Sequence, residues 1–288
     1  MGTSPLSLFE ELFAQLEESW MVLPDKPEET PESTVRALIS LIGGDPTGES
    51  EVRLRDLVAQ RKSGTPLAYL TGRQNFMGLD LLVSPEALIP RKETEILAGG
   101  ALEVLRAIAD RRGTAFVIDL CCGSGNVALA LAHHEPRARV IGADLSQDCV
   151  NLATRNAVHV TLSDSVTFVQ SDLLEAFAKP EFLGHVDLIT CNPPYISSAK
   201  VEAMPHEISG YEPRLAFDGG PFGVKILTRL IREANRYLRK DGWLAFEVGL
   251  GQGPGVAKML TKSGSYADIR ELRDNGGETR SLIARCVG

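Results

Sequence analysis

The sequence predicts an α/β fold with a doubly wound, parallel sheet, preceded by a small helical unit and a hairpin-like connector. From Ala115 onward, short apolar runs alternate with segments of helical periodicity, which is typical of strands joined by crossover helices. Before residue 72, apolar residues recur at helical spacing. Between these regions, strand-like residues flank Gly78, and Pro85 and Pro90 follow. We therefore expect a helical domain over 1–71, a β-hairpin connector over 72–92 and an α/β domain over 93–288.

Composition excludes several classes of protein. The chain has 288 residues, of which 43% are hydrophobic and 24% charged, so it can bury a core. Its 30 Lys and Arg residues stand against 38 Asp and Glu residues, a formal charge of -8. A nucleic-acid partner is therefore not expected, because contact with phosphates needs clustered cations. No signal peptide or membrane-spanning apolar stretch is apparent, so we expect a cytoplasmic protein without membrane contact.

Cysteine and histidine spacing predicts no metal site. The five cysteines are odd in number and lie mostly among apolar neighbours, which fits reduced thiols in a core. None has the C-x-x-C spacing of a zinc site. His133 and His134 are adjacent, so they point to different faces of a helix.

Three amphipathic helices are expected in the N-terminal unit, over Phe9–Trp20, Val35–Ile42 and Leu54–Val58. We expect their apolar stripes to pack against one another; recognition of a partner is the alternative. In the α/β domain, the patterns predict strands over 115–120, 138–145, 166–170, 186–192 and 243–249, and helices over 126–134, 149–159 and 225–238.

A glycine-containing turn follows the first of these strands. Gly123 and Gly125 precede a helix that opens at Asn126, and glycines permit a sharp turn and a close backbone approach to a ligand. The segment Gly123–Ala128 also satisfies the dinucleotide pattern G-x-G-x-x-G/A. An NAD-binding oxidoreductase is therefore one alternative, although neither a Tyr-x-x-x-Lys pair nor a histidine acid is placed for hydride transfer.

Three acidic residues favour a cationic ligand over a pyrophosphate. Asp119 precedes the glycine turn, Asp144 ends the second strand, and Asp172 follows the third. Asp144 is placed to accept hydrogen bonds from ribose hydroxyls, and Asp172 to accept one from an adenine amino group or to cap the next helix. Carboxylates stabilise a phosphate-free, net cationic ligand. We therefore predict S-adenosyl-L-methionine as the cofactor, with S-adenosyl-L-homocysteine as its product.

The segment Asn192–Tyr195 is the most informative in the chain. It follows an apolar strand, and its two prolines fix a stiff loop. The Asn192 side-chain oxygen and the Pro193 carbonyl can accept both hydrogens of a planar NH2 group, while Tyr195 can stack on a flat one. Positioning of this kind contributes up to roughly 7–11 kcal/mol. We therefore predict an N-methyltransferase with Asn192, Pro193 and Tyr195 as catalytic residues; a non-catalytic binding module is an alternative.

From Gly72 onward the sequence resembles the release-factor glutamine N5-methyltransferases. The resemblance rests on Asn192–Tyr195 together with Ile89–Glu95, Asp119–Gly125, Tyr211–Pro213, Asp218–Gly220, and Phe246–Gly249 with Gln252. It implies a class I methyltransferase, Rossmann-like sheet of seven strands with a reversed final hairpin. It also implies a helical N-terminal domain on the substrate side and a release factor as partner. The Asn-Pro-Pro-Tyr motif also occurs in nucleic-acid adenine methyltransferases, but the flanking motifs and the acidic charge favour the glutamine branch.

The resemblance and the patterns above together give a set of expected site residues. The expected cofactor contacts are Asp119, Cys121, Cys122, Gly123, Ser124, Gly125, Asp144, Leu145, Asp172, Leu173 and Asn192. The expected substrate contacts are Pro90, Arg91, Glu93, Asn192, Pro193, Pro194, Tyr195 and Glu212.

Three departures from the family lie on the substrate side. Lys92 stands where the family usually has proline, and the helical N-terminal unit of the family is typically longer than residues 1–65 here. The segment Asp218–Val224 also differs from the usual ending of its motif. An alternative acceptor is a free amino acid that bears an amide or guanidinium group, such as arginine. Glu207, Glu212 or Asp218 would then supply negative charge for a cationic acceptor. The oligomeric state is not predicted.

Overall fold

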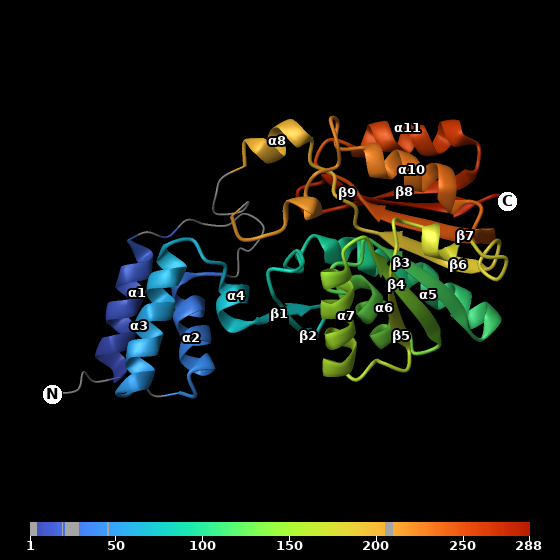
Figure 1. Ribbon diagram of the computed structural model, residues 1–288. Coiled ribbons are helices and arrows are strands. Elements are labelled where there is room, and N and C mark those ends of the chain that lie inside the picture. Colours follow the sequence, from blue (N-terminus) through green and yellow to red (C-terminus); the bar gives the residue numbers. More distant parts are fainter. Residues whose placement is uncertain (1–4, 19, 21–28, 45, 205–209) are drawn as a thin grey trace. The chain divides into compact units, whose positions relative to one another are not determined.

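The computed structural model describes residues 5–18, 20, 29–44, 46–204 and 210–288. These residues divide into two compact units, shown in Figure 1. The first unit contains the described residues up to Arg73, with Gly210 and Tyr211; the second contains the other described residues from Gln74 onward. No helix in the described part of the chain is long and apolar enough to cross a membrane.

The first unit is built from helices with a core of their own. They are α1 (Pro5–Glu17), α2 (Pro31–Leu41), α3 (Glu49–Lys62) and the short α4 (Leu67–Thr71). Thr30 and Ser33 cap α2 reciprocally, each hydroxyl accepting from the other residue's backbone N–H at 3.0 and 2.8 Å. The expected packing of the apolar stripes is confirmed, because one buried cluster unites Leu8, Leu12, Leu16, Val35, Leu38, Leu54, Leu57 and Val58.

The expected hairpin is present. Strands β1 (Arg73–Phe76) and β2 (Leu79–Leu82) form a two-stranded sheet. They are joined at Met77 and Gly78, whose φ angles of +48° and +84° match the two-residue turns that favour hairpins. The side chain of Asn156, which is fully buried, accepts from Leu82 N at 2.7 Å and donates to Leu82 O at 3.1 Å.

Seven strands form the main sheet, in the order β5-β4-β3-β6-β7-β9-β8. They are β3 (Ala115–Leu120), β4 (Ala138–Asp144), β5 (Val166–Gln170), β6 (Val186–Cys191), β7 (Leu238–Glu247), β8 (Tyr266–Arg273) and β9 (Thr279–Cys286). The first five are parallel, which confirms the doubly wound pattern, and β9 runs antiparallel to both of its neighbours. The reversed final hairpin implied by the family resemblance is therefore present.

Helices cover both faces of this sheet (Figure 1). One face packs against α5 (Thr94–Arg112), α6 (Asn126–His134) and α7 (Gln147–His159), and the other against α10 (Lys225–Ala234) and α11 (Gly253–Ser263). Short turns of helix occur at α8 (Ser198–Glu202), η1 (Glu175–Phe177) and η2 (Arg214–Ala216). Along β3, Val117 faces the first cluster of buried residues, whereas Ile118 faces the second. The strand is thus apolar on both faces, as parallel strands require.

The predicted helix over 225–238 is too long. It ends at Ala234, and β7 begins at Leu238, five residues before the predicted strand. Val186 N donates to Tyr237 O at 3.0 Å, which draws this segment into the sheet. The apolar residues after Ala234 serve the strand ladder instead of a helix face.

The sheet is closely packed where Phe168 meets β4. A Cβ at Gly142 would lie 2.4 Å from two carbons of the Phe168 ring, whereas a Cβ at Gly99 on α5 would meet nothing. We therefore expect Gly142→Ala to lower the free energy of unfolding by about 1–3 kcal/mol, the usual effect of overpacking a core. Gly99→Ala is the control and should raise it by about 0.5–1 kcal/mol. Urea denaturation measures both; equal stabilities for the two variants would contradict this packing.

Candidate active site

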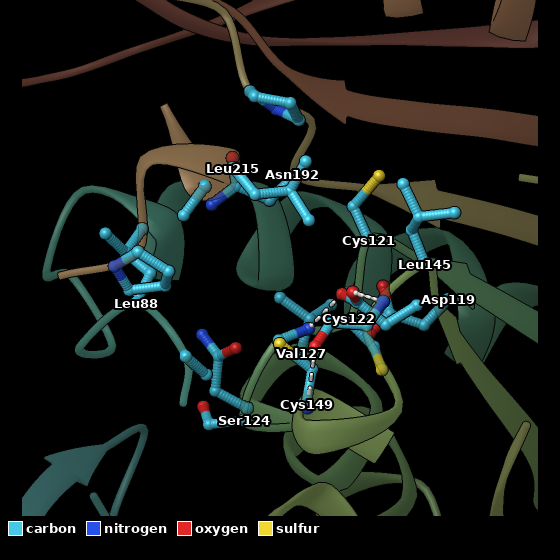
Figure 2. Close-up of a pocket in the computed structure, with 18 of the residues that line it drawn as sticks. Leu88, Asp119, Cys121, Cys122, Ser124, Val127, Leu145, Cys149, Asn192 and Leu215 are labelled. Atoms are coloured by element: carbon cyan, nitrogen blue, oxygen red, sulfur yellow. Dashed lines mark hydrogen bonds between the residues drawn. The ribbon is translucent and has the colours of Figure 1, made fainter. Parts of the chain in front are cut away.

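A pocket in the second unit opens at the carboxyl ends of β3, β4 and β6, the usual binding crevice of such sheets. Its walls come from the loop after β3, the residues that follow β4, β5 and β6, and the segments 86–91 and 213–218. Figure 2 draws Asn192 and Leu215 on one side of this pocket and Ser124 and Cys149 on the opposite side.

The two glycines of the loop after β3 have different tasks. Gly123 and Gly125 have φ angles of +53° and +82°, so the predicted sharp turn is present. A Cβ at Gly123 would meet no atom within 4 Å, whereas one at Gly125 would lie 2.8 Å from the Phe168 ring and 3.0 Å from Ala153. Gly123 lines the pocket and Gly125 does not. Gly125 therefore permits close packing of the loop, and only Gly123 leaves room for a ligand.

Asp119 is buried beneath the pocket. Its Oδ2 accepts from Ala128 N at 3.2 Å and its Oδ1 accepts from the Thr190 hydroxyl at 2.7 Å. Burial raises its pKa to about 7. Ala128 is the third residue of α6, so the carboxyl takes up a backbone N–H at the helix N-terminus, where a pyrophosphate would otherwise bind. This arrangement disfavours the dinucleotide alternative.

Asp144 lies at the end of β4 and lines the pocket. Its oxygens accept one hydrogen bond each, from Gly123 N and Ser146 N, both at 2.9 Å. Burial raises its pKa, and these two backbone hydrogen bonds oppose the shift. Each carboxylate oxygen retains a further lone pair for a ligand hydroxyl. The next residue, Leu145, is half exposed (51%) and offers an apolar surface at the same place.

Asp172 lines the pocket but is paired with an arginine. Arg229 Nη1 donates to its Oδ1 at 2.6 Å, and the same guanidinium contacts Glu175 and Glu233. The alternative role of Asp172 as a helix cap is not seen, since η1 has no side-chain cap. Arg229 offsets the charge of Asp172, so the pocket is less negative than three free carboxylates would make it.

Asn192 follows the last residue of β6 and lies in the pocket wall. Its Nδ2 donates to the Thr94 hydroxyl at 3.1 Å, and no described residue donates to its Oδ1. The side-chain oxygen is therefore left for a ligand. Thr94, the first residue of α5, is 1% exposed. The sequence carries no signal for this contact, because 98 positions separate the two residues.

The Asn192–Tyr195 loop is held by two segments that the sequence analysis gave no separate role. Ile196 N donates to Phe217 O at 2.9 Å, and Gly219 N donates to Ile196 O at 2.8 Å. From the other segment, the Gln252 side chain donates to Tyr195 O at 2.9 Å and accepts from Gly249 N at 2.9 Å. The motifs around Asp218 and Glu247 therefore fix the loop.

Two predicted catalytic residues do not line the pocket. Pro193 is buried, and no described group donates to its carbonyl oxygen. The Tyr195 hydroxyl donates to Oε1 of Glu247, the last residue of β7, at 2.9 Å. Stacking of Tyr195 on an acceptor group stays a prediction.

Only some of the predicted substrate contacts line the pocket. Pro90, Arg91 and Pro194 line the pocket, whereas Glu93 and Glu212 do not. Glu212 accepts from Ile89 N at 2.9 Å and pairs with Arg91 at 2.5 Å, and Glu93 pairs with Arg280 at 3.3 Å. Glu212 therefore holds Arg91 in place.

The cationic-acceptor alternative needs carboxylates that are free to bind. Glu212 is held as described above, and Asp218 accepts from the Ser198 hydroxyl at 2.7 Å and from Gly220 N at 3.0 Å. Glu207 lies outside the described residues. Of the two described candidates, Asp218 lines the pocket and Glu212 does not, and both carboxylates already accept hydrogen bonds from the protein.

Most of the expected cofactor residues meet at one pocket. Its lining includes Asp119, Cys121, Cys122, Gly123, Ser124, Asp144, Leu145, Asp172, Leu173 and Asn192. It also includes residues that the sequence analysis missed, among them Glu86, Leu88, Thr94, Val127 and Cys149. Lys92, the departure from the family pattern, pairs with Glu95 at 2.6 Å.

Comparisons with known proteins show which proteins the chain is similar to. A family model described as "Methyltransferase small domain" matches residues 98–209. A release factor glutamine methyltransferase of Moorella thermoacetica is 38% identical over 81% of this chain and 79% of its own length. One from Streptomyces coelicolor is 33% identical over 95% and 98% of the two chains. The hMettl16 catalytic domain, solved with the MAT2A 3'UTR hairpin 6, shares the fold, with a TM-score of 0.55 and 16% identity over 82% of this chain and 81% of that one.

Gly223 and Gly251 provide a matched test of how the loop is held. Both have left-handed φ angles, +69° and +78°, but a Cβ at Gly223 would lie 2.2 Å from Tyr195 O, whereas one at Gly251 would meet nothing. We expect Gly223→Ala to displace the loop and to accelerate amide hydrogen exchange at Ile196 at least tenfold. Gly251→Ala carries the same backbone strain, about 1–2 kcal/mol, without the clash. If both variants exchange alike at Ile196, the close approach of Gly223 does not hold the loop.

Proposed function

Because the chain belongs to the family of release factor glutamine methyltransferases, we propose that it methylates the side-chain amide nitrogen of a glutamine in a peptide-chain release factor, with S-adenosyl-L-methionine as the donor. The chain is a methyltransferase with the class I methyltransferase fold. One observation carries the choice of acceptor: Asn192 lies in the pocket wall with its NH2 group bonded to Thr94 and its oxygen left open.

The residues of the pocket fit the proposed cofactor. The Ser124 hydroxyl is buried, lines the pocket and has no hydrogen-bond partner among the described residues, so it can serve a ligand. Asp144 has lone pairs for two ribose hydroxyls, and Leu145 and Leu173 offer apolar surface for a flat base. The Asp119 carboxyl lies beneath the loop. The positive charge of bound S-adenosyl-L-methionine would favour the ionised form of this carboxyl.

The acceptor geometry follows from two oxygens. When bound, S-adenosyl-L-methionine supplies a methyl carbon activated by its sulfonium. Asn192 Oδ1 accepts one hydrogen of the glutamine amide, and we assign the other to the Pro193 carbonyl, to which no described group donates although Pro193 itself does not line the pocket. The two contacts would aim the weak lone pair of the nitrogen at that carbon. As the nitrogen–carbon bond forms, the carbon–sulfur bond breaks and its electron pair stays on sulfur. The nitrogen then gives up one proton to water, so a strong general base is not needed.

The proposal extends to the rest of the chain. The helical domain over 1–71 helps to hold the release factor, the hairpin over 72–92 connects it, and residues 93–288 bind the cofactor and catalyse the transfer. Residues 1–62 contain 12 acidic and 6 basic residues, a net charge of -6, which suits a partner with a basic surface. A cytoplasmic location is part of the same proposal.

Methyl transfer to a purified bacterial release factor tests the acceptor. With donor labelled in the methyl group, we expect label on one glutamine of the release factor, located by mass spectrometry of its peptides. Asn192→Ala should lower kcat by about 10²–10³ because an oxygen that positions the amide is lost. Label on free glutamine or arginine, with none on the release factor, would replace this acceptor with a small molecule.

Calorimetry tests the cofactor assignment. Asp144→Ala should weaken binding of S-adenosyl-L-homocysteine by about 10- to 100-fold, the effect of losing a charged hydrogen-bond acceptor. Asp148→Ala is the control. Asp148 lies in the first turn of α7, is exposed and does not line the pocket. An unchanged dissociation constant for Asp144→Ala, or binding of NAD in place of S-adenosyl-L-homocysteine, would refute the assignment.

A further inference from the structure

Glu247 is a buried carboxyl that lies beside the Asn192–Tyr195 loop. It is the last residue of β7, is 1% exposed and does not line the pocket. Strand β7 is the neighbour of β6, from which the loop departs, and Phe246 is the register partner of Cys191. Glu247 therefore stands at the level where the chain leaves β6.

The carboxyl of Glu247 is bonded to the side chain that ends this loop. The Tyr195 hydroxyl donates to its Oε1 at 2.9 Å, whereas its Oε2 has no hydrogen-bond partner among the described residues. Burying a polar group costs free energy unless a hydrogen bond compensates. Displacement of Tyr195 would leave the buried carboxyl without this donor, so the contact opposes such a displacement.

The rest of Tyr195 is held as closely. The Gln252 side chain donates to its carbonyl oxygen at 2.9 Å. A Cβ at Gly249 would lie 3.1 Å from Cδ2 of its ring, so the ring packs against the backbone that follows β7. Tyr195 is not among the residues that line the pocket. Its ring, hydroxyl and carbonyl oxygen are thus all bound by the protein itself.

Two prolines transmit this restraint to the proposed acceptor site. Proline fixes its own φ angle, so Pro193 and Pro194 form a stiff link between Asn192 and Tyr195. The other end of the link is held by the hydrogen bond from Asn192 Nδ2 to the Thr94 hydroxyl at 3.1 Å. A shift of Tyr195 therefore moves the Pro193 carbonyl, the second oxygen assigned to the acceptor amide.

We propose that Glu247 is a positioning residue that acts through the Tyr195 hydroxyl, and that Tyr195 serves the reaction by anchoring the loop and not by stacking on the acceptor. The pair fixes the Pro193 carbonyl relative to Asn192 Oδ1. A misplacement of reacting groups by about 1 Å costs about 100-fold in rate. For the kinetics this inference rests on the proposed function, because two oxygens must receive one amide; for the placement of the loop it does not.

Tyr195→Phe separates anchoring from stacking, because it keeps the ring and removes the hydroxyl. With the release factor as acceptor, we expect kcat to fall about 10- to 100-fold while KM changes far less, since the lost contact positions the amide without binding the release factor. Stacking requires the opposite result. An unchanged kcat in Tyr195→Phe would overturn the proposal.

Tyr266→Phe is the matched control. Tyr266 is buried on β8, its hydroxyl donates to Ile231 O at 3.0 Å, and neither residue lines the pocket. This variant also loses one hydrogen bond from a buried tyrosine, so it should match the loss of stability but keep kcat. A loss of kcat in Tyr266→Phe equal to that in Tyr195→Phe would assign the effect to stability and overturn the proposal.

A double-variant cycle assigns the effect to Glu247. Glu247→Leu removes the acceptor of the Tyr195 hydroxyl and should lower kcat as much as Tyr195→Phe does. Glu247→Gln keeps an acceptor oxygen and should retain most of the activity. The combination of Tyr195→Phe with Glu247→Leu should be no slower than either variant alone, because the two remove the same contact. Losses that multiply in the combination would overturn the proposal.

Amide hydrogen exchange tests the anchor without any acceptor. Ile196 N donates to Phe217 O at 2.9 Å directly after Tyr195, whereas Ile189 lies within β6 and reports opening of the sheet. We expect Tyr195→Phe and Glu247→Leu to raise the exchange rate at Ile196 relative to Ile189 by about tenfold or more, and Tyr266→Phe to leave this ratio unchanged.

The exchange ratio also separates this inference from the proposed function. A ratio that is the same in the unaltered protein, Tyr195→Phe and Glu247→Leu would overturn the anchor, whatever the acceptor of the enzyme is. Absence of methyl transfer to the release factor by the unaltered enzyme would refute the proposed function alone. If Tyr195→Phe does not fold, the comparison of Glu247→Leu with Glu247→Gln provides the same test from the other side of the contact.

Discussion

The hydrogen bond from Asn192 Nδ2 to the Thr94 hydroxyl is the interaction on which the active site depends. An asparagine amide has an acceptor at one end and donors at the other, and rotation by half a turn exchanges them at little steric cost. In this structure Thr94 accepts from the amide nitrogen, and it is shielded from water because it is 1% exposed and stands at the start of a 19-residue helix packed on the sheet. A threonine hydroxyl can also donate, so the orientation depends on this one hydrogen bond. The orientation of the Asn192 side-chain oxygen in the pocket thus depends on Thr94, a residue outside the Asn-Pro-Pro-Tyr motif.

The negative charge on the cofactor side of the pocket is smaller than three free carboxylates would give. Asp119 is bonded to Ala128 and Thr190, and Asp172 is paired with Arg229, so Asp144 is the acid with the least compensated charge at the pocket. Asp119 nevertheless contributes selectivity, since a carboxyl at the N-terminus of α6 repels phosphate where a dinucleotide-binding protein would attract it. The same glycine pattern can therefore serve two ligand classes, and a carboxyl such as that of Asp119, four positions before Gly123, disfavours a phosphate.

Much of the fold could be predicted from the sequence because the apolar patterns of parallel strands and their crossover helices are local. Strands β3 and β5 and helix α6 match their predicted bounds. The helix predicted to reach Leu238 failed because its last apolar residues pack in the sheet, a choice made by tertiary contacts and not by periodicity. The predicted site residues that follow β3, β4, β5 and β6 converge on the pocket because the carboxyl ends of parallel strands meet at one edge of the sheet. Thr94, Glu247 and the ion pair of Arg229 with Asp172 could not be predicted, since each joins positions more than 50 residues apart.

The glycines around the Asn-Pro-Pro-Tyr loop also limit how the site can diversify. A Cβ at Gly219 would lie 2.5 Å from Pro194 O and one at Gly223 would lie 2.2 Å from Tyr195 O, so both would collide with the backbone of the loop. A Cβ at Gly249 would lie 3.1 Å from the Tyr195 ring, which is a tight contact. Because of these contacts, the backbone of the loop has no room to shift. Adaptation to a larger or differently charged acceptor would have to occur elsewhere, for example at Leu215, which is half exposed in the pocket wall and has no such neighbour constraint from a glycine. The loop proposed to bind the reacting nitrogen is therefore separate from the part of the pocket wall, around Leu215, that would select the acceptor molecule.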